Sequence, residues 1–371
     1  MKISIITVLN TINYGSVLQT FATQKFFEKQ GFVVEFVDYW RDDQRVSSKI
    51  KKIVLDKKTS VSKWIKKPIR DVLEIASVLI GTRKFRNFLE SNIRLTANKY
   101  GSYRELCENV PEADIYATGS DQMWNSGWNQ GIEKSFFLEY APENKKRIAF
   151  ATSIGKTDWE QSEANTVVPL IKKYDYITLR EQSAVDLLSQ YKIKGHLVLD
   201  PTLLFDKEHW SEYLTPTKET EPYLLVYQLH QKHLQADFTE AVKKIAERKN
   251  LKIKRVTYSF SDRKVGEKIV LPEIFEFMAL IRDASFIVTD SFHGAAFSVN
   301  FNKSFAVLYP EQFSTRMDNL LAMTGLMQRR YTTDVQLSYY DEEIDYTDVN
   351  KLLCERRRQI ENDFVDYFNK L

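Results

Sequence analysis

The amino-acid sequence predicts an α/β fold in which two lobes, each built on a parallel sheet, face one another across a cleft. Three observations support this prediction. The chain has 371 residues, which exceeds the size at which a single core usually stops growing. Short apolar runs typical of buried strands alternate with segments of helical period. A polar, proline-flanked stretch at 214–222 interrupts this alternation, which then resumes, so we place the boundary between the lobes there.

The first lobe is predicted to span residues 1–216 and opens with a β-α-β unit. Residues 2–9 form an apolar strand, residues 17–30 place apolar side chains at helical spacing, and residues 32–39 read as the next strand. Gly31 between them is a typical helix end. This opening favours a parallel, doubly wound sheet. Further strand patterns lie at 113–119, 146–155, 174–180 and 195–200, and a helix pattern follows at 181–191.

The second lobe is predicted to span residues 217–345. Strand patterns occur at 223–229, 251–258, 285–290 and 304–309, with helical patterns at 238–250 and 272–284. Residues 346–371 are predicted to form a final amphipathic helix, because their apolar side chains recur on one stripe.

Composition excludes several classes of protein. The hydrophobic content of 43% suffices for packed cores, and the formal net charge of +3 is too small over this length to indicate a nucleic-acid-binding protein. Cys107 and Cys354 lie far apart without metal-ligand spacing, so we expect neither a disulfide framework nor a metal site. No apolar run approaches the roughly 20 residues that cross a bilayer, and we expect a cytoplasmic protein.

One segment of the first lobe, residues 45–94, is strongly basic and carries interleaved apolar side chains. Such a stretch suits peripheral contact with an anionic membrane or with an acidic substrate. The alternative is a solvated helical insertion. The basic residues are Lys49, Lys51, Lys52, Lys57, Lys58, Lys63, Lys66, Lys67, Arg70, Arg83, Lys84 and Arg86, and the apolar ones include Trp64, Ile65, Ile69 and Val72.

His293 is the leading candidate for chemistry. It follows the strand at 285–290 and begins a helix, and ligands of open α/β sheets bind at such carboxyl ends of strands. Backbone N–H groups at a helix start favour an anion, Gly294 permits close approach of a ligand, and an imidazole exchanges protons near neutral pH. Alternatively, His293 is a polar helix-start residue with Ser291 as the cap.

Three cations are candidates for binding an anion. Arg180 ends the strand at 174–180, where its guanidinium can bind a carboxylate or phosphate in two-pronged fashion. Its alternative is a surface ion pair with Glu181. Lys303 and Arg316 add weaker signals on the second lobe.

The stretch at 117–130, ATGSDQMWNSGWNQ, gathers amides and tryptophans after a strand. Amides that bond hydroxyl groups beside an indole that stacks on a ring suit a sugar. Alternatively, the tryptophans fill the core, and the turn after the first strand only serves its own backbone. The candidate acceptor residues are Asn13, Tyr14, Gly15, Ser120, Asp121, Gln122 and Trp124.

Together these segments resemble the polysaccharide pyruvyl transferase family. The resemblance rests on NYGSVLQTFATQKFFEKQGFVVEFVDY (13–39), ATGSDQMWN (117–125), LREQSAVDLL (179–188), LDPTLLF (199–205), TDSFHGAAFSVNF (289–301) and TRMDNLL (315–321). It covers the chain from about residue 2 to residue 330.

The resemblance implies two Rossmann-like lobes like those of B-type glycosyltransferases, with the acceptor on the first lobe and the donor on the second. It implies transfer of pyruvate from phosphoenolpyruvate to two hydroxyls of a sugar, as a ketal, in the biosynthesis of a surface polysaccharide. His293 would be the acid and Arg180 the anion clamp, with Ser291, Gly294, Lys303 and Arg316 on the donor side. No cofactor is expected beyond phosphoenolpyruvate as co-substrate, and the acceptor sugar can be lipid-linked.

One position departs from the family pattern. Members commonly carry an arginine two residues before the late histidine, and Ser291 stands there in this chain. A hydroxyl does not replace a two-pronged cation, so Arg316 or Lys303 would supply the charge. The alternative is a glycosyltransferase that uses a nucleotide-activated sugar on the same scaffold, since a fold does not fix the reaction. A non-catalytic carbohydrate-binding protein is the third alternative.

Overall fold

The computed structural model of the chain describes residues 1–55, 67–217, 219, 221–230, 237–310, 315–334 and 336–369. The part of the basic stretch that contains Trp64 and Ile65 lies outside these ranges, as do Lys57, Lys58, Lys63 and Lys66.

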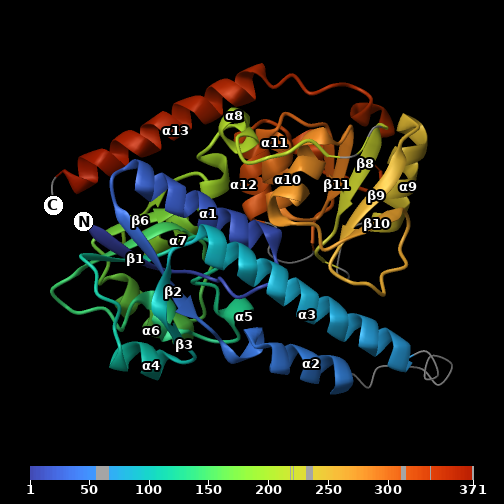
Figure 1. Cartoon of the computed structure of the whole chain (residues 1–371). Coiled ribbons are helices and arrows are strands. Elements are labelled where there is room, and N and C mark those ends of the chain that lie inside the picture. Colours follow the sequence, from blue (N-terminus) through green and yellow to red (C-terminus); the bar gives the residue numbers. More distant parts are fainter. Residues whose placement is uncertain are drawn as a thin grey trace.

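Two parallel sheets form the framework, and the predicted two-lobed α/β fold is confirmed (Figure 1). The sheet of the first lobe has the order β3 (Leu95–Tyr100), β2 (Val33–Tyr39), β1 (Lys2–Ile6), β4 (Ile115–Thr118), β5 (Lys146–Thr152), β6 (Tyr176–Leu179) and β7 (His196–Leu197). The sheet of the second lobe has the order β10 (Glu267–Val270), β9 (Lys252–Thr257), β8 (Tyr223–Tyr227), β11 (Phe286–Thr289) and β12 (Phe305–Val307). The domain boundary proposed at 216/217 lies between β7 and β8 and stays a prediction.

Helices connect and cover these strands. They are α1 (Tyr14–Lys29), α2 (Val46–Leu55), α3 (Lys67–Asn92), α4 (Tyr103–Glu108), α5 (Ser126–Asn129), α6 (Gln161–Ile171), α7 (Gln182–Gln190), α8 (Lys207–Ser211), α9 (Phe238–Lys249), α10 (Ile274–Asp283), α11 (Phe292–Asn300), α12 (Thr315–Met323) and α13 (Thr347–Phe368). None of the helices in the described ranges is both long and apolar enough to cross a lipid bilayer.

The start of α1 is fixed by a side-chain cap. The Asn13 side-chain oxygen accepts hydrogen bonds from the backbone N–H groups of Gly15 and Ser16 at 2.9 and 3.3 Å. The helix therefore begins three residues earlier than its apolar pattern predicts. Its first turn is consequently packed into the space between the lobes.

The two lobes share one hydrophobic core. The ring of Tyr14 on α1 stacks on Phe277 of α10 with the centroids 4.2 Å apart, and its hydroxyl donates to the Pro272 carbonyl at 2.7 Å. A single cluster of buried side chains continues from Ile3 in the first sheet to Ile287 in the second. Apolar burial thus fixes the relative position of the lobes near the first turn of α1.

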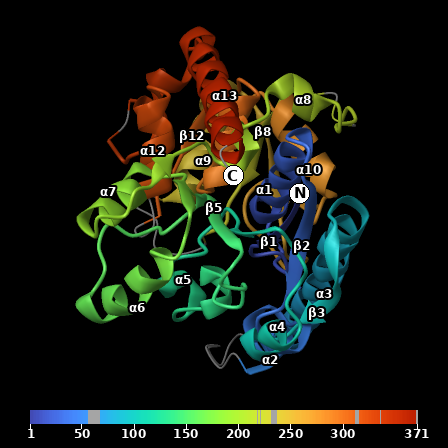
Figure 2. The same ribbon diagram turned by 90° about the vertical axis from the view of Figure 1, so that its left-hand side faces the viewer.

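Two long helices cross between the lobes (Figures 1 and 2). The final helix, α13, follows the second lobe in sequence, yet its Phe364 ring packs edge-on against Phe26 and Phe150 of the first. On the other side, α3 contacts the second lobe, where Ser77 Oγ accepts a hydrogen bond from the Phe260 backbone N–H at 2.9 Å. The lobes are therefore tied at two separate places.

The inner end of α3 is held to the first sheet by a buried ion pair. Arg86 donates to both carboxylate oxygens of Asp38 on β2, at 2.8 and 2.7 Å, and the Asp38 side chain is 1% exposed. Asn10 and Trp40 also donate to this carboxylate. A buried carboxylate in this setting depends on its cation.

We expect Arg86→Met to lower the free energy of unfolding by about 3 kcal/mol, because it leaves the Asp38 charge buried without a partner. Urea unfolding followed by circular dichroism measures this change. Arg104→Met is the matched control, since Arg104 pairs with Glu108 on the surface at 88% and 54% exposure, and should change stability by less than about 1 kcal/mol. Equal effects of the two variants would show that the buried pair is not what holds α3.

Candidate functional site

A cavity of about 500 Å³ lies in the cleft between the lobes. The turn before α1, the segment at 41–49 and the turn after β4 form its wall on the first lobe. The loops after β8 and β11 and the start of α12 form its wall on the second. Its charged and imidazole side chains are Arg41, Asp43, Lys49, Asp121, His230, His293 and Arg316. These segments follow the carboxyl ends of parallel strands, where ligands of such sheets bind.

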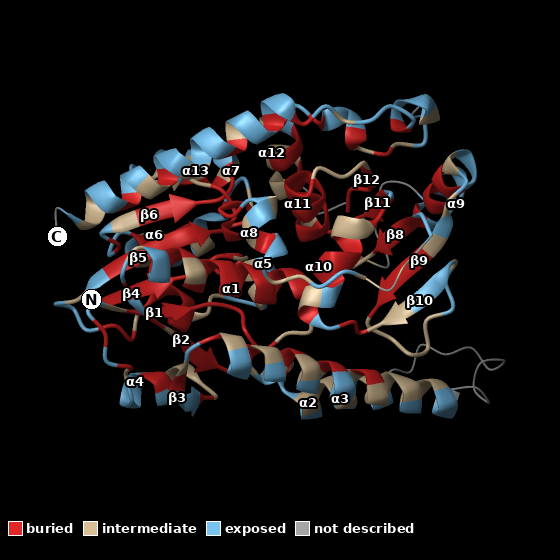
Figure 3. Cartoon of the chain, turned by 45° about the horizontal axis from the view of Figure 1, so that its top comes forward, coloured by how far each residue is buried: buried red, intermediate tan, exposed pale blue. Residues whose placement is uncertain are grey.

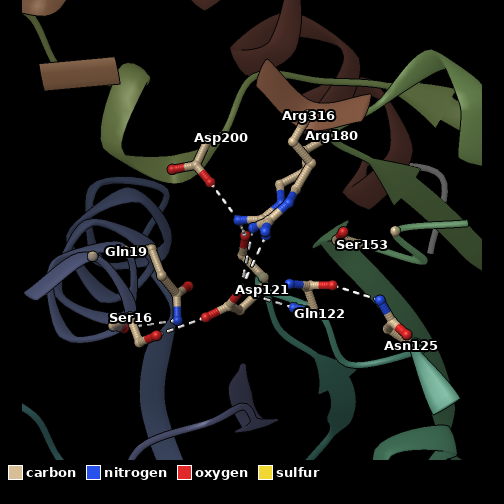
Figure 4. Close-up of polar contacts among 12 residues, drawn as sticks. Ser16, Gln19, Asp121, Gln122, Asn125, Ser153, Arg180, Asp200 and Arg316 are labelled. Carbon is tan, nitrogen blue, oxygen red and sulfur yellow. Dashed lines mark hydrogen bonds and ion pairs between the residues drawn. The ribbon is translucent and has the colours of Figure 1, made fainter. Parts of the chain in front are cut away.

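Buried charges of the first lobe converge beside this cavity (Figure 4). Arg180, directly after β6, donates to Asp200 Oδ2 at 2.6 Å and to Asp121 Oδ1 at 3.1 Å. Its side chain is 0% exposed, and Ser120 Oγ accepts a third bond from it at 3.3 Å. Asp121 and Asp200 follow β4 and β7. Arg180 is therefore committed to carboxylates of the chain, and its predicted part as a direct clamp on the ligand is corrected to holding Asp121 and Asp200.

His293 approaches the same carboxylate from the second lobe. Its Nε2 atom lies 3.6 Å from Asp200 Oδ2, which is too long for a hydrogen bond, and it has no hydrogen-bond partner among the described residues. The side chain is only 7% exposed and forms part of the cavity wall. Asp200 thus lies between the guanidinium of Arg180 and the imidazole of His293. The two residues expected to act together do lie together.

The two carboxyl groups of this cluster, those of Asp121 and Asp200, have lowered pKa values. Burial alone raises the pKa of Asp121, but the charges of Arg180, Arg316 and His293 outweigh it and bring the pKa down to about 2. Burial likewise raises the pKa of Asp200, and His293, Arg180 and Thr202 more than reverse that effect. Both groups are therefore anionic at neutral pH.

Arg316, at the start of α12, is the cation of the second lobe in the cavity wall. Its Nη1 atom lies 3.8 Å from Asp121 Oδ1, and its guanidinium carbon lies 5.6 Å from the centroid of the Phe292 ring. Its Nε atom has no hydrogen-bond partner among the described residues. Burial and the neighbouring charge of Arg180 lower its pKa to about 10. An anionic ligand in the cavity would offset the repulsion between the charges of Arg316 and Arg180.

Two helices present their amino ends to the cavity. Asn13 and Ser16 at the start of α1, and Ser291 and His293 at the start of α11, belong to its wall. Ser16 Oγ donates to Asp121 Oδ2 at 2.7 Å, so the first turn of α1 is also tied to the ion cluster. Aligned helix dipoles favour negative charge in the space between them.

Asp290 holds the loop after β8, which forms part of the cavity wall on the second lobe. Its carboxylate accepts hydrogen bonds from the backbone N–H groups of Leu229 and His230 at 2.7 and 2.9 Å, and this loop forms part of the cavity wall. Burial raises the pKa of Asp290 to about 7, although these N–H groups act in the opposite direction. Asp290 thus holds His230 at the cavity.

Three predicted contacts are wrong because of where the side chains lie. Trp124 is 1% exposed in the core of the first lobe, stacked on Phe137, so it cannot meet an acceptor sugar. Tyr14 is 0% exposed in the core between the lobes. Lys303 follows the carboxyl end of α11, the opposite end from His293, so it does not serve the donor.

The two glycines serve packing. A Cβ atom on Gly15 would lie 2.0 Å from His293 Nδ1, and one on Gly294 would lie 2.4 Å from the Thr289 hydroxyl. Gly15 therefore makes room for the imidazole, and Gly294 for close packing of α11 on β11. Their predicted contacts with ligands are replaced by these roles. Asn13, Asp121, Gln122, Ser291 and Arg316 do lie in the cavity wall, and Ser120 lies behind it as an acceptor for Arg180.

Sequence reasoning missed several members of the site. Asp200 is the last residue of the strand pattern at 195–200 and is not among the candidate residues, although an acid directly after a parallel strand is itself a signal of a site. Arg41 and Lys49 also line the cavity, and nothing in their local sequence assigns them to it. Trp128, in the stretch at 117–130 that the sequence singled out for a sugar, lines it as well. Among the described residues, no group of three or more His, Cys, Asp or Glu side chains is arranged to hold a metal ion.

Comparison with known families identifies residues 13–312 as a polysaccharide pyruvyl transferase domain. The chain belongs to this family. Membership indicates a transferase that modifies polysaccharide, as the motifs led us to expect. Comparison with curated proteins gave no significant match.

Solved structures agree on the fold. S. aureus MnaA, in a co-structure with UDP, is 12% identical, with a TM-score of 0.52 over 100% of this chain and 97% of that one. A putative UDP-N-acetylglucosamine 2-epimerase from Listeria monocytogenes is also 12% identical, with a TM-score of 0.52 over 97% and 90% of the two chains. The chain thus shares the two-lobed fold of these two solved structures.

We expect Gly15→Ala to displace His293, because its Cβ atom has no space beside Nδ1. The ring NMR signals of His293 should shift, and the unfolding temperature should fall. Gly127→Ala is the control, since the nearest atom to its Cβ would be the Asn125 side-chain oxygen at 3.3 Å. Unchanged His293 signals in Gly15→Ala would contradict the close packing of the two residues.

Asp121 should contribute stability that depends on pH. Its pKa of about 2 in the folded protein lies below the ordinary value of 3.8. Between these two pH values the unfolded chain therefore binds more protons than the folded one. The contribution is present above about pH 4 and is lost as the pH falls toward 2. Urea unfolding from pH 5 to pH 2.5 should therefore show a steeper loss of stability in the native protein than in Asp121→Asn. Parallel curves for the two proteins would show that the neighbouring charges do not lower the pKa of Asp121.

Proposed function

We propose that this protein transfers pyruvate from phosphoenolpyruvate to two hydroxyl groups of a sugar, forming a cyclic ketal during synthesis of a surface polysaccharide. The observation that carries the proposal is the pairing, in one cavity wall, of an imidazole and a guanidinium whose Nε2 and Nε atoms have no hydrogen-bond partner among the described residues. These are His293 and Arg316. Family membership supports a transferase, and the co-substrate is our assignment.

The donor side is assigned to the second lobe. Phosphoenolpyruvate is a small dianion or trianion, and the amino ends of α1 and α11 and the charge of Arg316 favour such a ligand. Ser291 caps α11 by accepting a hydrogen bond from the Gly294 N–H at 3.3 Å. Arg316 reaches the cavity from α12. Its guanidinium supplies the positive charge that the hydroxyl of Ser291 cannot provide.

The chemistry requires one group that donates a proton to carbon and one site that binds the departing phosphate. Protonated His293 gives its proton to the methylene carbon of phosphoenolpyruvate, and a sugar hydroxyl oxygen forms a bond to the adjacent carbon. The second hydroxyl then forms the other C–O bond as the C–O bond to phosphate breaks. One hydroxyl proton restores the imidazolium and the other leaves with phosphate, so the transfer is balanced without a further reactant.

Asp200 and Arg180 have positioning parts in this scheme. The Asp200 carboxylate lies 3.6 Å from the Nε2 atom of His293, and Arg180 fixes that carboxylate in place. The acceptor lies on the first lobe, where Asn13, Gln122 and the 47% exposed indole of Trp128 line the cavity. Trp128 takes the stacking role that the sequence assigned to Trp124.

Incubation of the purified protein with phosphoenolpyruvate and candidate nucleotide- or lipid-linked sugars tests the proposal. We expect release of phosphate that requires the sugar, with a ketal in the product by NMR. His293→Asn should lower the rate by about 10² to 10⁴ through loss of the acid. Phosphoenolpyruvate should raise the unfolding temperature of the native protein, and Arg316→Met should remove that protection.

His209→Asn is the matched histidine control, since His209 lies on α8 outside the cavity wall and should leave the rate unchanged. Protection by UDP but not by phosphoenolpyruvate, with turnover of a nucleotide sugar alone, would overturn the proposal in favour of glycosyl transfer. Full activity of His293→Asn would remove the assigned acid.

A further inference from the structure

The helices α2 and α3 carry an unusual concentration of exposed apolar side chains. Thirteen large hydrophobic residues of the described chain are exposed, and six of them belong to this pair of helices. Their exposed fractions run from 40% to 67%. They are Val54, Leu55, Ile69, Val72, Leu79 and Ile80. The two helices lie side by side along one edge of the molecule (Figures 1 and 2).

The exposed apolar side chains of α3 lie on one face. Residues 69, 72, 76, 79 and 80 recur at helical spacing, so they share a face over three turns. The same face continues inward through Arg83, Asn87 and Glu90, which are polar. Figure 3 shows the exposed and half-buried outer sides of both helices. The outer half of the face is thus apolar and the half near the first sheet is polar.

Another face of α3 is already occupied. The Glu74 carboxylate accepts a hydrogen bond from the Ser259 hydroxyl at 2.5 Å, and the Lys84 amine donates to the Leu271 carbonyl at 2.7 Å. A Cβ atom on Gly81 would meet Ile12 and Leu271 at 3.0 and 3.2 Å. Contacts among the described residues therefore account for this side of α3, and the apolar side chains on its other face remain exposed.

The same helices hold a surplus of positive charge. Their sequences contain eight Lys and Arg residues against three Asp and Glu residues, a difference of +5, whereas the whole chain has a net charge of +3. The remainder of the chain is therefore net negative at −2. Lys51, Lys52 and Arg83 are exposed beside the apolar side chains.

We propose that the exposed face of α2 and α3 binds the surface of an anionic lipid bilayer, with its apolar side chains among the acyl chains and its lysines at the headgroups. Apolar side chains flanked by cations match the chemistry of that surface. A second copy of this chain fits less well, because it would bring two faces of charge +5 together.

Membrane binding would also place the cavity favourably. Lys49 of α2 lines the cavity, whereas Lys51, two residues along the same helix, is exposed. Burial lowers the pKa of Lys49. An anion beside the Lys49 amine would stabilise its charged form. A sugar held at the bilayer by a phosphate-linked lipid would therefore meet the cavity along α2. This part rests on the proposed function, and the binding to lipid does not.

Sedimentation of the full chain with vesicles tests the proposal. We expect binding to vesicles of phosphatidylglycerol and phosphatidylcholine, much weaker binding to phosphatidylcholine alone, and partial release at high salt. The double variant Ile69→Ser, Val72→Ser should weaken binding by about tenfold or more, because two side chains no longer enter the acyl region. Lys51→Glu should weaken binding and make the binding that remains less sensitive to salt, because fewer cations face the headgroups.

The controls are Val365→Ser and Lys243→Glu, which change an exposed valine of α13 and an exposed lysine of α9 and should leave vesicle binding unaltered. The Ile69, Val72 double variant should keep its unfolding temperature and its activity on a water-soluble acceptor, so failure of the enzyme assignment is recognised separately. Equal binding to neutral vesicles, no binding to anionic ones, or unchanged binding by the double variant would overturn the proposal. A dimer broken by the double variant would also overturn it.

Discussion

The buried ion cluster of Asp121, Arg180 and Asp200 is the constraint on which the cleft depends. The side chains of Arg180 and Asp200 are 0% and 1% exposed and that of Asp121 is 14% exposed, and loss of one of these charges leaves another without compensation in the interior. The three residues follow β4, β6 and β7, so the parallel order β4-β5-β6-β7 in the sheet brings them to the same edge. The cluster then fixes the carboxylate beside His293.

Contacts between the lobes depend on the same geometry. His293 fits against α1 because Gly15 has no side chain, and Ser16 in the next position bonds to Asp121. The stacking of Tyr14 on Phe277 packs the first turn of α1 against the second lobe. The imidazole thus reaches a site built mainly by the other lobe, and the shared apolar core holds it there.

The long helices separate structural and surface roles along their length. The inner end of α3 is bound to β2 through Arg86 and Asp38, whereas its outer end leaves Ile69 and Val72 exposed. Apolar side chains at the surface lower the stability of a chain in water unless something covers them, which gives the outer part of α3 a physical reason to bind elsewhere. In α2, cavity wall and outer surface belong to one helix, through Lys49 and Lys51.

The sequence by itself determined the alternation of strands and helices, the two lobes, the final helix and the family, because these follow from local periodicity and from ordered motifs. It also indicated His293, Asp121 and Arg316, which line the cavity, since each lies just after a buried strand or at the start of a helix. The edge strands β3 and β10 escaped prediction because LTANKY and EKIV have no continuous apolar run. Only the tertiary structure decided that Arg180 binds carboxylates of its own chain, that Trp124 is buried while Trp128 is exposed, and that Gly15 makes room for His293. These outcomes depend on burial or on contacts between residues 20 or more positions apart, and neither is encoded in local spacing.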